Sequence, residues 1–324
     1  MIRRVGIALV ALWAAAAMAA PVLAPHAVDA QFVDLQNAPP SRLTMAGARI
    51  AIHPWRLVNR LEQQYAVDDA IAVPLRWFSG GHLVGSSDEA RAPLLLLGTD
   101  AYRRDVFTRL VFGARTSLAL AAVSALGAMV LGAAAGGVAG YAGGGVDDVL
   151  MRTADFVMVL PAMYVALALR AAMPLVLAPA TVFALLASIF AIVGAPFVAR
   201  GVRAIVRSER RMDYAVAAEA LGAGAGRLLL RHLLPAARGY IAVQLTLLVP
   251  AFIVAEATLS YVGLGFPDPV ASWGTMLHDA SANVRVFADF PWLLSPAAAM
   301  FLVVLGLNLA LEGSPGGLRY DTPR

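Results

Sequence analysis

The chain has 324 residues, and its composition excludes most classes of soluble protein. Hydrophobic residues make up 60% of it and charged residues 14%, with a mean hydropathy of +0.73, whereas soluble domains are about half apolar and about a quarter charged. Cysteine and lysine are both absent, and all 25 basic residues are arginine. These absences exclude disulfides, thiolate metal sites, lysine Schiff bases and the lysine of a P-loop.

Charge-free apolar runs predict an all-α membrane protein with six spanning helices. A helix needs roughly 20 mostly apolar residues to cross a bilayer, and the run 116–146 contains no charge. The predicted helices cover residues 5–25, 117–140, 155–174, 179–200, 239–260 and 290–311. An extended loop separates the first two.

The first apolar run has two interpretations, which the sequence leaves open. Arg3 and Arg4 precede an alanine-rich core that includes Ala17-Met18-Ala19, a small-residue pattern that also occurs at signal cleavage sites. The run reaches Pro25, which is longer than a usual signal core and favours a retained helix. In either case the following residues lie outside the cytoplasm.

The placement of arginine predicts the orientation. Segment 200–238 holds eight arginines against three acids, whereas segment 261–289 holds one arginine against three acids. Because short cytoplasmic loops carry the excess of basic residues, the first segment is predicted to be cytoplasmic and the second external. With six spans, both termini, including the tail 312–324, are then cytoplasmic.

The long external region contains two expected parts. Residues 26–99 mix aromatic and charged residues and are expected to form a loop or small ordered cap whose elements no clear period identifies. Thr99 or Asp100 is a candidate N-cap for a short amphipathic helix over 100–115. Such a helix is expected to lie in the membrane interface just before the second span.

Four glycines recur at intervals of four in or near the second span, at Gly132, Gly136, Gly140 and Gly144. Small residues at this spacing let a neighbouring helix approach closely. Chance spacing in a span rich in alanine and glycine is the alternative interpretation.

The cytoplasmic segment 213–235 reads DYAVAAEALGAGAGRLLLRHLLP. Its first part, 214–221, favours a helix, three glycines then break it, and a second short helix over 227–234 is expected to end at Pro235. Two short helices with a glycine-rich bend form a compact knob suited to docking on a soluble partner. A solvated basic loop against anionic lipid is the alternative.

This segment resembles the coupling loop of binding-protein-dependent ABC-transporter permeases. The family pattern is Glu-Ala-Ala, a glycine after three further residues, and then apolar-x-Leu-Pro. The residues that fit it are Ala217, Ala218, Gly222, Leu233, Leu234 and Pro235. Val216 stands where the family has its leading Glu, and Glu219 comes three residues later. The ion pair of the family Glu with its ATPase therefore does not carry over.

Further stretches resemble the C-type permeases of the dipeptide/oligopeptide/nickel family. They are LGTDAYRRDVF at 97–107, GARTSL at 113–118, AEATLSYVGLG at 255–265 and SWGTML at 272–277. The family usually has Gly before the Arg-Asp pair, where this chain has Arg103. The resemblance covers about residues 95–310 and implies a permease core over 116–311.

The resemblance implies a type I ABC importer in a bacterial inner membrane, and its expected cargo is a dipeptide or oligopeptide. Its expected partners are a second permease, two ATPase subunits, a solute-binding protein and membrane lipids, without nucleic acid. The chain itself is expected to be no enzyme and to hold no cofactor, since the partner subunits bind ATP. No metal is expected either, because the five histidines show no ligand spacing. The residues expected to contact the ATPase are Val216, Ala217, Ala218, Glu219, Gly222, Leu234 and Pro235.

Three polar residues fall inside the predicted spans. Glu256 is interpreted as a structural partner for a neighbouring helix or as a pathway acid that meets a peptide's amino terminus. Arg170 is expected to extend to the outer interface, with a pathway role as the alternative. Asn308 is expected to form an interhelical hydrogen bond.

Two other functions stay open on the residues alone. A stand-alone secondary transporter or channel for a small solute would show internal repeats and paired broken helices, and neither is evident. A membrane-bound enzyme would show a catalytic constellation, and no Ser-His-Asp set or pair of carboxylates stands out.

Overall fold

The computed structural model describes residues 2–46, 49–160, 164–165, 167–168, 177–282 and 285–312. The chain forms two compact units, 1–118 with 257–310 and 119–256 with 311–324. Two long helices, α3 (Val106–Ala142) and α9 (Arg238–Tyr261), contribute residues to both units. Arg170 and most of the predicted tail lie outside the described residues.

The helices of the first unit pack through small residues. Besides parts of α3 and α9, they are α1 (Ile2–Met18), α2 (Ala20–Leu23), α10 (Trp273–Ser281), the 3-10 helix η3 (Pro291–Leu294) and α11 (Ser295–Glu312). Gly6 of α1 faces Gly306 of α11, and a Cβ added at Gly6 would lie 2.5 Å from the Gly306 carbonyl oxygen. This contact therefore depends on the absence of a side chain.

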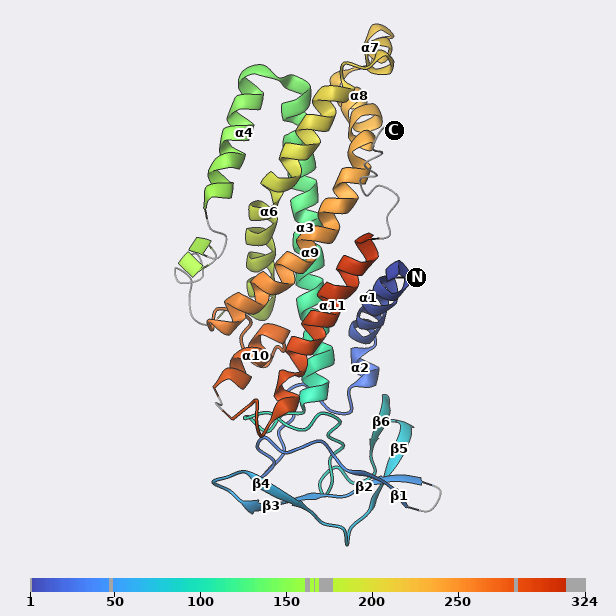
Figure 1. Ribbon diagram of the computed structural model, residues 1–324, viewed down its shortest axis with the longest axis vertical. Coiled ribbons are helices and arrows are strands. Elements are labelled where there is room, and N and C mark those ends of the chain that lie inside the picture. The colour runs from blue at the N-terminus through green and yellow to red at the C-terminus, as the bar shows by residue number, and fades with distance from the viewer. Residues whose placement is uncertain are drawn as a thin grey trace, which may run out of the picture. The chain divides into compact units, whose positions relative to one another are not determined.

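The first unit also contains a β-strand region (Figure 1) that the sequence analysis expected only as a loop or cap. Its strands are β1 (Leu43–Ala46), β2 (Arg49–Ile52), β3 (Trp55–Asn59), β4 (Gln64–Val67), β5 (Val73–Ser79) and β6 (His82–Ser86). Antiparallel pairing gives one sheet in the order β1-β2-β5-β6 and a separate β3-β4 hairpin. Ile52, Val73 and Leu94 are buried in its small core. The chain is thus a helical membrane protein with an added β region, rather than wholly α.

The second unit contains the remaining helices. They are α4 (Gly144–Val159), α6 (Pro179–Glu209), α7 (Asp213–Ala220), α8 (Ala225–Leu228), the π-helix η1 (Leu229–Leu233) and the 3-10 helix η2 (Leu234–Ala237), together with most of α3 and α9. Phe190 of α6 stacks on Phe252 of α9, with ring centroids 5.4 Å apart. A Cβ added at Gly194 would lie 2.7 Å from the ring of Phe252, so this pair also needs a glycine.

The glycine spacing of the second span marks the contact between α3 and α6. A Cβ at Gly132 would lie 2.6 Å from the Ala195 carbonyl oxygen, and one at Gly140 would lie 2.7 Å from that of Arg203. A Cβ at Gly136 would overlap the Ala199 carbonyl. The predicted close approach is confirmed for these three glycines. It is wrong for Gly144, which has a φ of +55°, starts α4 and has open space around it.

Among the described residues, four helices are long and apolar enough to cross a membrane: Val106–Ala142, Pro179–Glu209, Ala225–Tyr261 and Pro291–Ala310. They correspond to the second, fourth, fifth and sixth predicted spans. The first predicted span contains α1, which has 17 residues. Much of the third, 155–174, lies outside the described residues, and α4 begins before it at Gly144. The helical class is confirmed, whereas the count of six stays a prediction.

The expected separate helix over 100–115 is wrong, because one continuous helix runs from Val106 to Ala142. No proline interrupts this stretch. Asp105, rather than Thr99 or Asp100, caps it: its carboxylate accepts the backbone N–H of Phe107 at 3.1 Å and of Thr108 at 3.3 Å. Asp100 instead accepts the backbone N–H of Tyr102 and of Arg104 in the preceding turn.

We predict that Gly136→Ala destabilises the second unit, because the new methyl group would overlap the backbone of α6. Overpacking of this kind typically costs about 1–3 kcal/mol. Gly145→Ala is the matched control, since a Cβ there meets nothing within 4 Å. Melting of the two variants in detergent, followed by size-exclusion chromatography, should show a lower Tm only for Gly136→Ala. Equal melting temperatures would contradict the packing described here.

Candidate functional site

The first half of the segment 213–235 is a short helix that ends in a glycine turn. α7 follows α6 after three residues and lies beyond the end of α6 (Figure 1). Gly222 has a φ of +86°, a left-handed conformation that favours glycine. The Gly222 N–H donates to the Glu219 carbonyl at 2.9 Å, and the Ala223 N–H donates to the Ala218 carbonyl at 3.0 Å. This pair of bonds is a Schellman cap, so the expected helix break occurs at Gly222 for a defined backbone reason.

The second half differs from the sequence expectation, because the helix does not end at Pro235. α8 passes through the π turn η1 and the 3-10 turn η2 directly into α9. Proline lacks the N–H that a regular helix requires. The π turn gives the Leu234 N–H the Leu229 carbonyl as its acceptor, and Pro235 sits in the first turn of η2, where no N–H is needed. The irregular turns therefore accommodate Pro235, and the helical segment continues into α9.

The segment leaves a set of apolar side chains exposed. Val216 is 55% exposed, and Leu221, just before the glycine turn, is 89% exposed. Leu230 after the turn is 70% exposed. Sequence reasoning included Val216 but missed the two leucines, although an apolar residue next to a helix-ending glycine is a readable signal. We call Val216, Leu221 and Leu230 the apolar knob.

The other residues expected at this site divide into exposed and packed positions. Ala217, Glu219, Gly222 and Pro235 are exposed, and Ala218 is half-buried. Leu234 is half-buried as well and packs on α3, where its Cδ2 would lie 3.2 Å from a Cβ at Gly137. Leu234 thus holds the segment on its own unit.

Glu219 ties α7 to the ends of α3 and α6. Its Oε1 accepts the hydroxyl of Tyr141 at 3.3 Å and lies 3.7 Å from the Arg210 guanidinium. Arg210 in turn donates to the Tyr141 carbonyl and lies 4.3 Å from the centre of the Tyr141 ring. Tyr141 is next to the last residue of α3, and Arg210 follows the last residue of α6. We call Tyr141, Arg210 and Glu219 the α7 anchor.

A second link joins α6 to α7. The hydroxyl of Tyr214 donates to Oε2 of Glu209 at 2.6 Å. This hydrogen bond is the main reason that the pKa of Tyr214 is raised to about 12. The phenol therefore stays protonated and keeps donating at any physiological pH.

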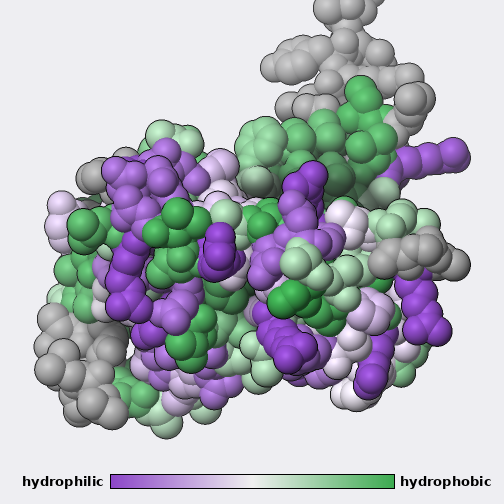
Figure 2. Space-filling model, turned by 90° about the horizontal axis from the view of Figure 1, so that it is seen from below, coloured by the Kyte–Doolittle hydropathy of each residue, from purple (hydrophilic) through white to green (hydrophobic). Residues whose placement is uncertain are grey.

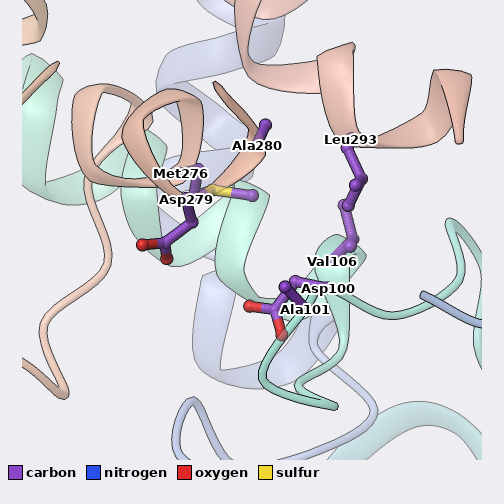
Figure 3. A pocket seen from close by; sticks show the side chains of 7 residues that line it. All are labelled: Asp100, Ala101, Val106, Met276, Asp279, Ala280 and Leu293. Atoms are coloured by element: carbon purple, nitrogen blue, oxygen red, sulfur yellow. The ribbon is translucent and has the colours of Figure 1, made fainter. Parts of the chain in front are cut away.

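In the first unit, Arg104 joins three carboxylates. Its Nε donates to Asp100 at 2.7 Å, its Nη1 to Asp268 at 2.9 Å and its Nη2 to Asp279 at 2.6 Å. Figure 3 shows the Asp100 and Asp279 carboxylates beside one small cavity of about 10 Å³, which is room for about one water molecule. Burial raises the pKa of Asp279, and the charges of Arg104 and Arg109 oppose that rise.

The same region buries Trp273 and Arg109. The backbone N–H of Trp273 donates to Ser117 Oγ at 3.2 Å, and its indole N–H donates to the Leu110 carbonyl at 3.1 Å. Gly113 lets α3 approach this indole, because a Cβ there would lie 3.3 Å from it. The contacts therefore join stretches 97–118 and 272–277, which the sequence showed only as separate motifs.

The family model for "Binding-protein-dependent transport system inner membrane component" matches residues 109–314, more than half of the chain. The chain belongs to this family. It is a multi-pass membrane permease component of a transporter, and catalysis of ATP hydrolysis belongs to other subunits of such systems. The match begins three residues into α3, so the β-strand region precedes it.

Relatives with assigned names support the resemblance found in the sequence. The oligopeptide transport system permease protein OppC of Bacillus subtilis is 36% identical over 217 residues, which cover 67% of this chain and 68% of that protein. The dipeptide transport system permease protein DppC of Escherichia coli is 40% identical over 247 residues, 76% of each chain. The di/tripeptide permease protein DppC of Pseudomonas aeruginosa is 32% identical over 262 residues, covering 80% and 79%.

Of the three polar residues in the predicted spans, the structure describes Glu256 and Asn308. Glu256 lies in α9 and is 1% exposed, and its structural and pathway interpretations both stay predictions. Asn308 is exposed on α11, so its interhelical hydrogen bond stays a prediction. Arg170 lies outside the described residues.

We predict that Arg104→Gln strongly destabilises the first unit, because it leaves three neighbouring carboxylates without their shared cation. Breaking a buried ion pair by removing one partner costs about 3–5 kcal/mol. Arg103→Gln is the control, since Arg103 is the adjacent residue and is exposed. Thermal melting in detergent should separate the two variants, and a stable Arg104→Gln protein would show that the cluster is not structurally important.

We also predict that Glu219→Ala loosens α7 without unfolding the protein. Exposed pairs contribute about 0–1 kcal/mol each, so amide hydrogen exchange in 213–220 should accelerate by up to about fivefold through easier local opening. Tyr141→Phe keeps the ring beneath Arg210 and removes only the hydroxyl, so its effect should be smaller. Hydrogen exchange measured by mass spectrometry tests both variants. Unchanged exchange in α7 of Glu219→Ala would show that the α7 anchor does not restrain the helix.

Proposed function

We propose that this chain is the C-type permease subunit of a type I ABC importer for dipeptides or oligopeptides. In this proposal it forms half of the translocation pathway beside a second, different permease. Two ATPase subunits bind ATP, and a solute-binding protein delivers the peptide. The substrate class rests on the relatives, which are named as oligopeptide, dipeptide and di/tripeptide permeases.

The observation that carries the coupling role is the exposed apolar knob on an anchored helix. Val216 lies in α7, Leu221 at the C-cap of α7 and Leu230 in η1, and exposed apolar side chains of this kind mark a surface suited to a protein partner. The Schellman turn at Gly222 fixes the direction of the chain between Val216 and Leu230, and the α7 anchor joins the knob to α3 and α6. A push on the knob would therefore reach two spanning helices.

The orientation is part of the proposal. The end of α6 and the segment after it carry most of the eight arginines of 200–238, which supports a cytoplasmic position for the knob. The β-strand region then lies on the external side, and both termini are cytoplasmic. The membrane is the bacterial inner membrane, in agreement with the family description.

The proposed mechanism is a population shift. ATP binding favours the closed arrangement of the two ATPase subunits. The apolar knob moves with these subunits because it is docked on their surface. α3 and α6 then favour one of two pathway openings, since a ligand shifts an equilibrium only by its differential affinity for the two states. The ATP itself is held by the ATPase subunits, because this chain lacks the lysine of a P-loop.

The proposed contact with the ATPase is apolar where the family pattern is acidic. Val216 replaces the leading Glu of the family pattern, and the carboxylate of Glu219 already has Tyr141 and Arg210 as partners. The proposed contact residues are Val216, Ala217, Ala218 and Gly222, together with the exposed Leu221 and Leu230 of the apolar knob. Leu234 and Pro235 have a supporting role, because they pack or shape the chain behind the knob.

We predict that Gly222→Asp abolishes uptake while the transporter complex still assembles. The substitution places a side chain at a φ of +86°, which costs about 1–2 kcal/mol, and adds a charge beside the apolar knob. Gly224→Asp is the control: it adds the same charge two residues later at a φ of −68°, where Asp is a favourable N-cap for α8. Both variants would be co-expressed with the second permease, the ATPase subunits and the solute-binding protein. Peptide uptake would measure transport, and co-purification would measure assembly of the complex.

Unchanged uptake by Gly222→Asp in a complex that transports would contradict the coupling role. Equal loss in both variants would assign the effect to the charge and not to the turn. Solute movement by the purified chain without ATPase subunits would favour the stand-alone transporter instead.

A further inference from the structure

Two large aromatic side chains lie exposed at the end of the β5-β6 hairpin. Trp77 is 55% exposed and Phe78 is 80% exposed, and the hairpin turns at Gly80-Gly81 just beyond them. The hairpin packs on the β core through the buried Val73 and the partly buried Leu75 and Val84, and Val84 is the register partner of Trp77. Among the described residues, neither Trp77 nor Phe78 belongs to that core cluster.

The backbone conformation of Phe78 is energetically unfavourable. Its φ is +52°, in the left-handed region, which costs a residue with a Cβ roughly 1–2 kcal/mol. Glycine or asparagine would suit this position better. Residues held in such conformations cluster at binding and functional sites. A bulky aromatic residue that is both strained and exposed indicates a role outside the fold itself.

The hairpin end is fixed beside the end of the first apolar segment. The Nδ1–H of His82, at the start of β6, donates to the Ala24 carbonyl at 2.6 Å, and β6 lies next to α2 in Figure 1. Ala20 and Ala24 pack in turn against Val111 of α3. These contacts place the aromatic end at the level of the first turns of α3.

The charges of α3 show where the membrane begins. Arg115 is exposed, and no charged residue follows it before α3 ends at Ala142. The hydrocarbon core is about 30 Å thick, or about 20 helical residues, and α3 spans about 55 Å at 1.5 Å per residue. A core of this length fits within the charge-free residues 116–142, so the exposed Arg115 marks the earliest point at which it can begin. Val111, one turn earlier, then lies outside the hydrocarbon core.

We propose that the end of the β5-β6 hairpin inserts Trp77 and Phe78 into the lipid headgroup region beside α2. Tryptophan and other amphipathic aromatic residues are enriched at this level of the membrane. Met18 and Val22 on the adjoining α1–α2 segment are also exposed, at 76% and 49%. Arg76, exposed beside Trp77, is placed to bind a lipid phosphate.

The rest of the β-strand region has a different surface. Figure 2, which looks at the molecule from below, shows polar and apolar groups interspersed there and not gathered into one apolar face. Leu61, in the turn between β3 and β4, is 94% exposed. Leu61 is therefore a matched control, an exposed apolar residue at the turn of another hairpin.

Because the chain contains no cysteine, single-cysteine variants need no other change. Phe78→Cys and Leu61→Cys would each be nitroxide-labelled in the full chain and reconstituted in vesicles of phosphatidylethanolamine and phosphatidylglycerol. Electron paramagnetic resonance would measure collision with oxygen, which concentrates in lipid, and with a water-soluble nickel chelate. We expect a several-fold higher ratio of oxygen to nickel collisions for the Phe78 label than for the Leu61 label.

Equal ratios at the two positions would overturn the proposal, because Phe78 would then lie in water. Low collision with both reagents at Phe78 would also overturn it, in favour of contact with a protein such as a second permease. A second measurement avoids the label: brominated lipid should quench part of the tryptophan fluorescence of the unmodified chain, and Trp77→Phe should lose that part. If both proteins are quenched equally, Trp77 does not contact lipid.

Discussion

Close approach of helix backbones is the constraint on which the second unit depends. Apolar helices in a bilayer gain little from the hydrophobic effect, so small residues that permit tight packing decide which helices associate. Gly132, Gly136 and Gly140 provide this for α3 against α6. Gly140 is the last of these three glycines and directly precedes Tyr141, so its close contact with α6 helps to place Tyr141 beside Arg210. The glycine contacts thus position the α7 anchor, and the α7 anchor in turn positions α7.

The first unit depends on a cluster of ion pairs, whereas the second depends on glycine contacts between helices. Arg104 and its three carboxylates connect the turn before α3 with α10 and with Asp268, and the buried indole of Trp273 connects α10 with α3. A buried cation is costly unless its partners surround it, so this arrangement tolerates little rearrangement at the start of α3. Rigidity there also fixes α2 and, through His82, the end of the β5-β6 hairpin. The proposed membrane contact of Trp77 and Phe78 depends on this chain of contacts.

Hydropathy and residue spacing predicted the helical class and a close helix contact along the glycines of α3, because both follow from local composition, whereas the structure identifies α6 as the partner. They failed where the outcome depends on which of several neighbouring groups takes each hydrogen bond. Helix α3 begins at Val106 with Asp105 as its cap, and not near residue 100, since Asp100 is engaged with Arg104. Pro235 does not end a helix, because a π turn supplies an alternative acceptor to Leu234. The strands between Leu43 and Ser86 have four to seven residues and mixed exposure, which leaves no clear period of two.

The position of Glu219 shows why spacing alone could not assign the site. By sequence it is an acid near the place of the family Glu, and both an ATPase contact and an internal role fit it. In the structure its carboxylate lies between Tyr141 and Arg210, so using it for a partner would release the α7 anchor. Movement of the ATPase subunits reaches α3 and α6 only if the α7 anchor stays intact while the apolar knob is displaced. The same carboxylate is therefore poorly suited to both tasks at once, and in the proposed complex the docking energy comes from burial of Val216, Leu221 and Leu230. Burying such a side chain contributes about 1.5–3 kcal/mol, which compares well with the 0–1 kcal/mol of an exposed ion pair.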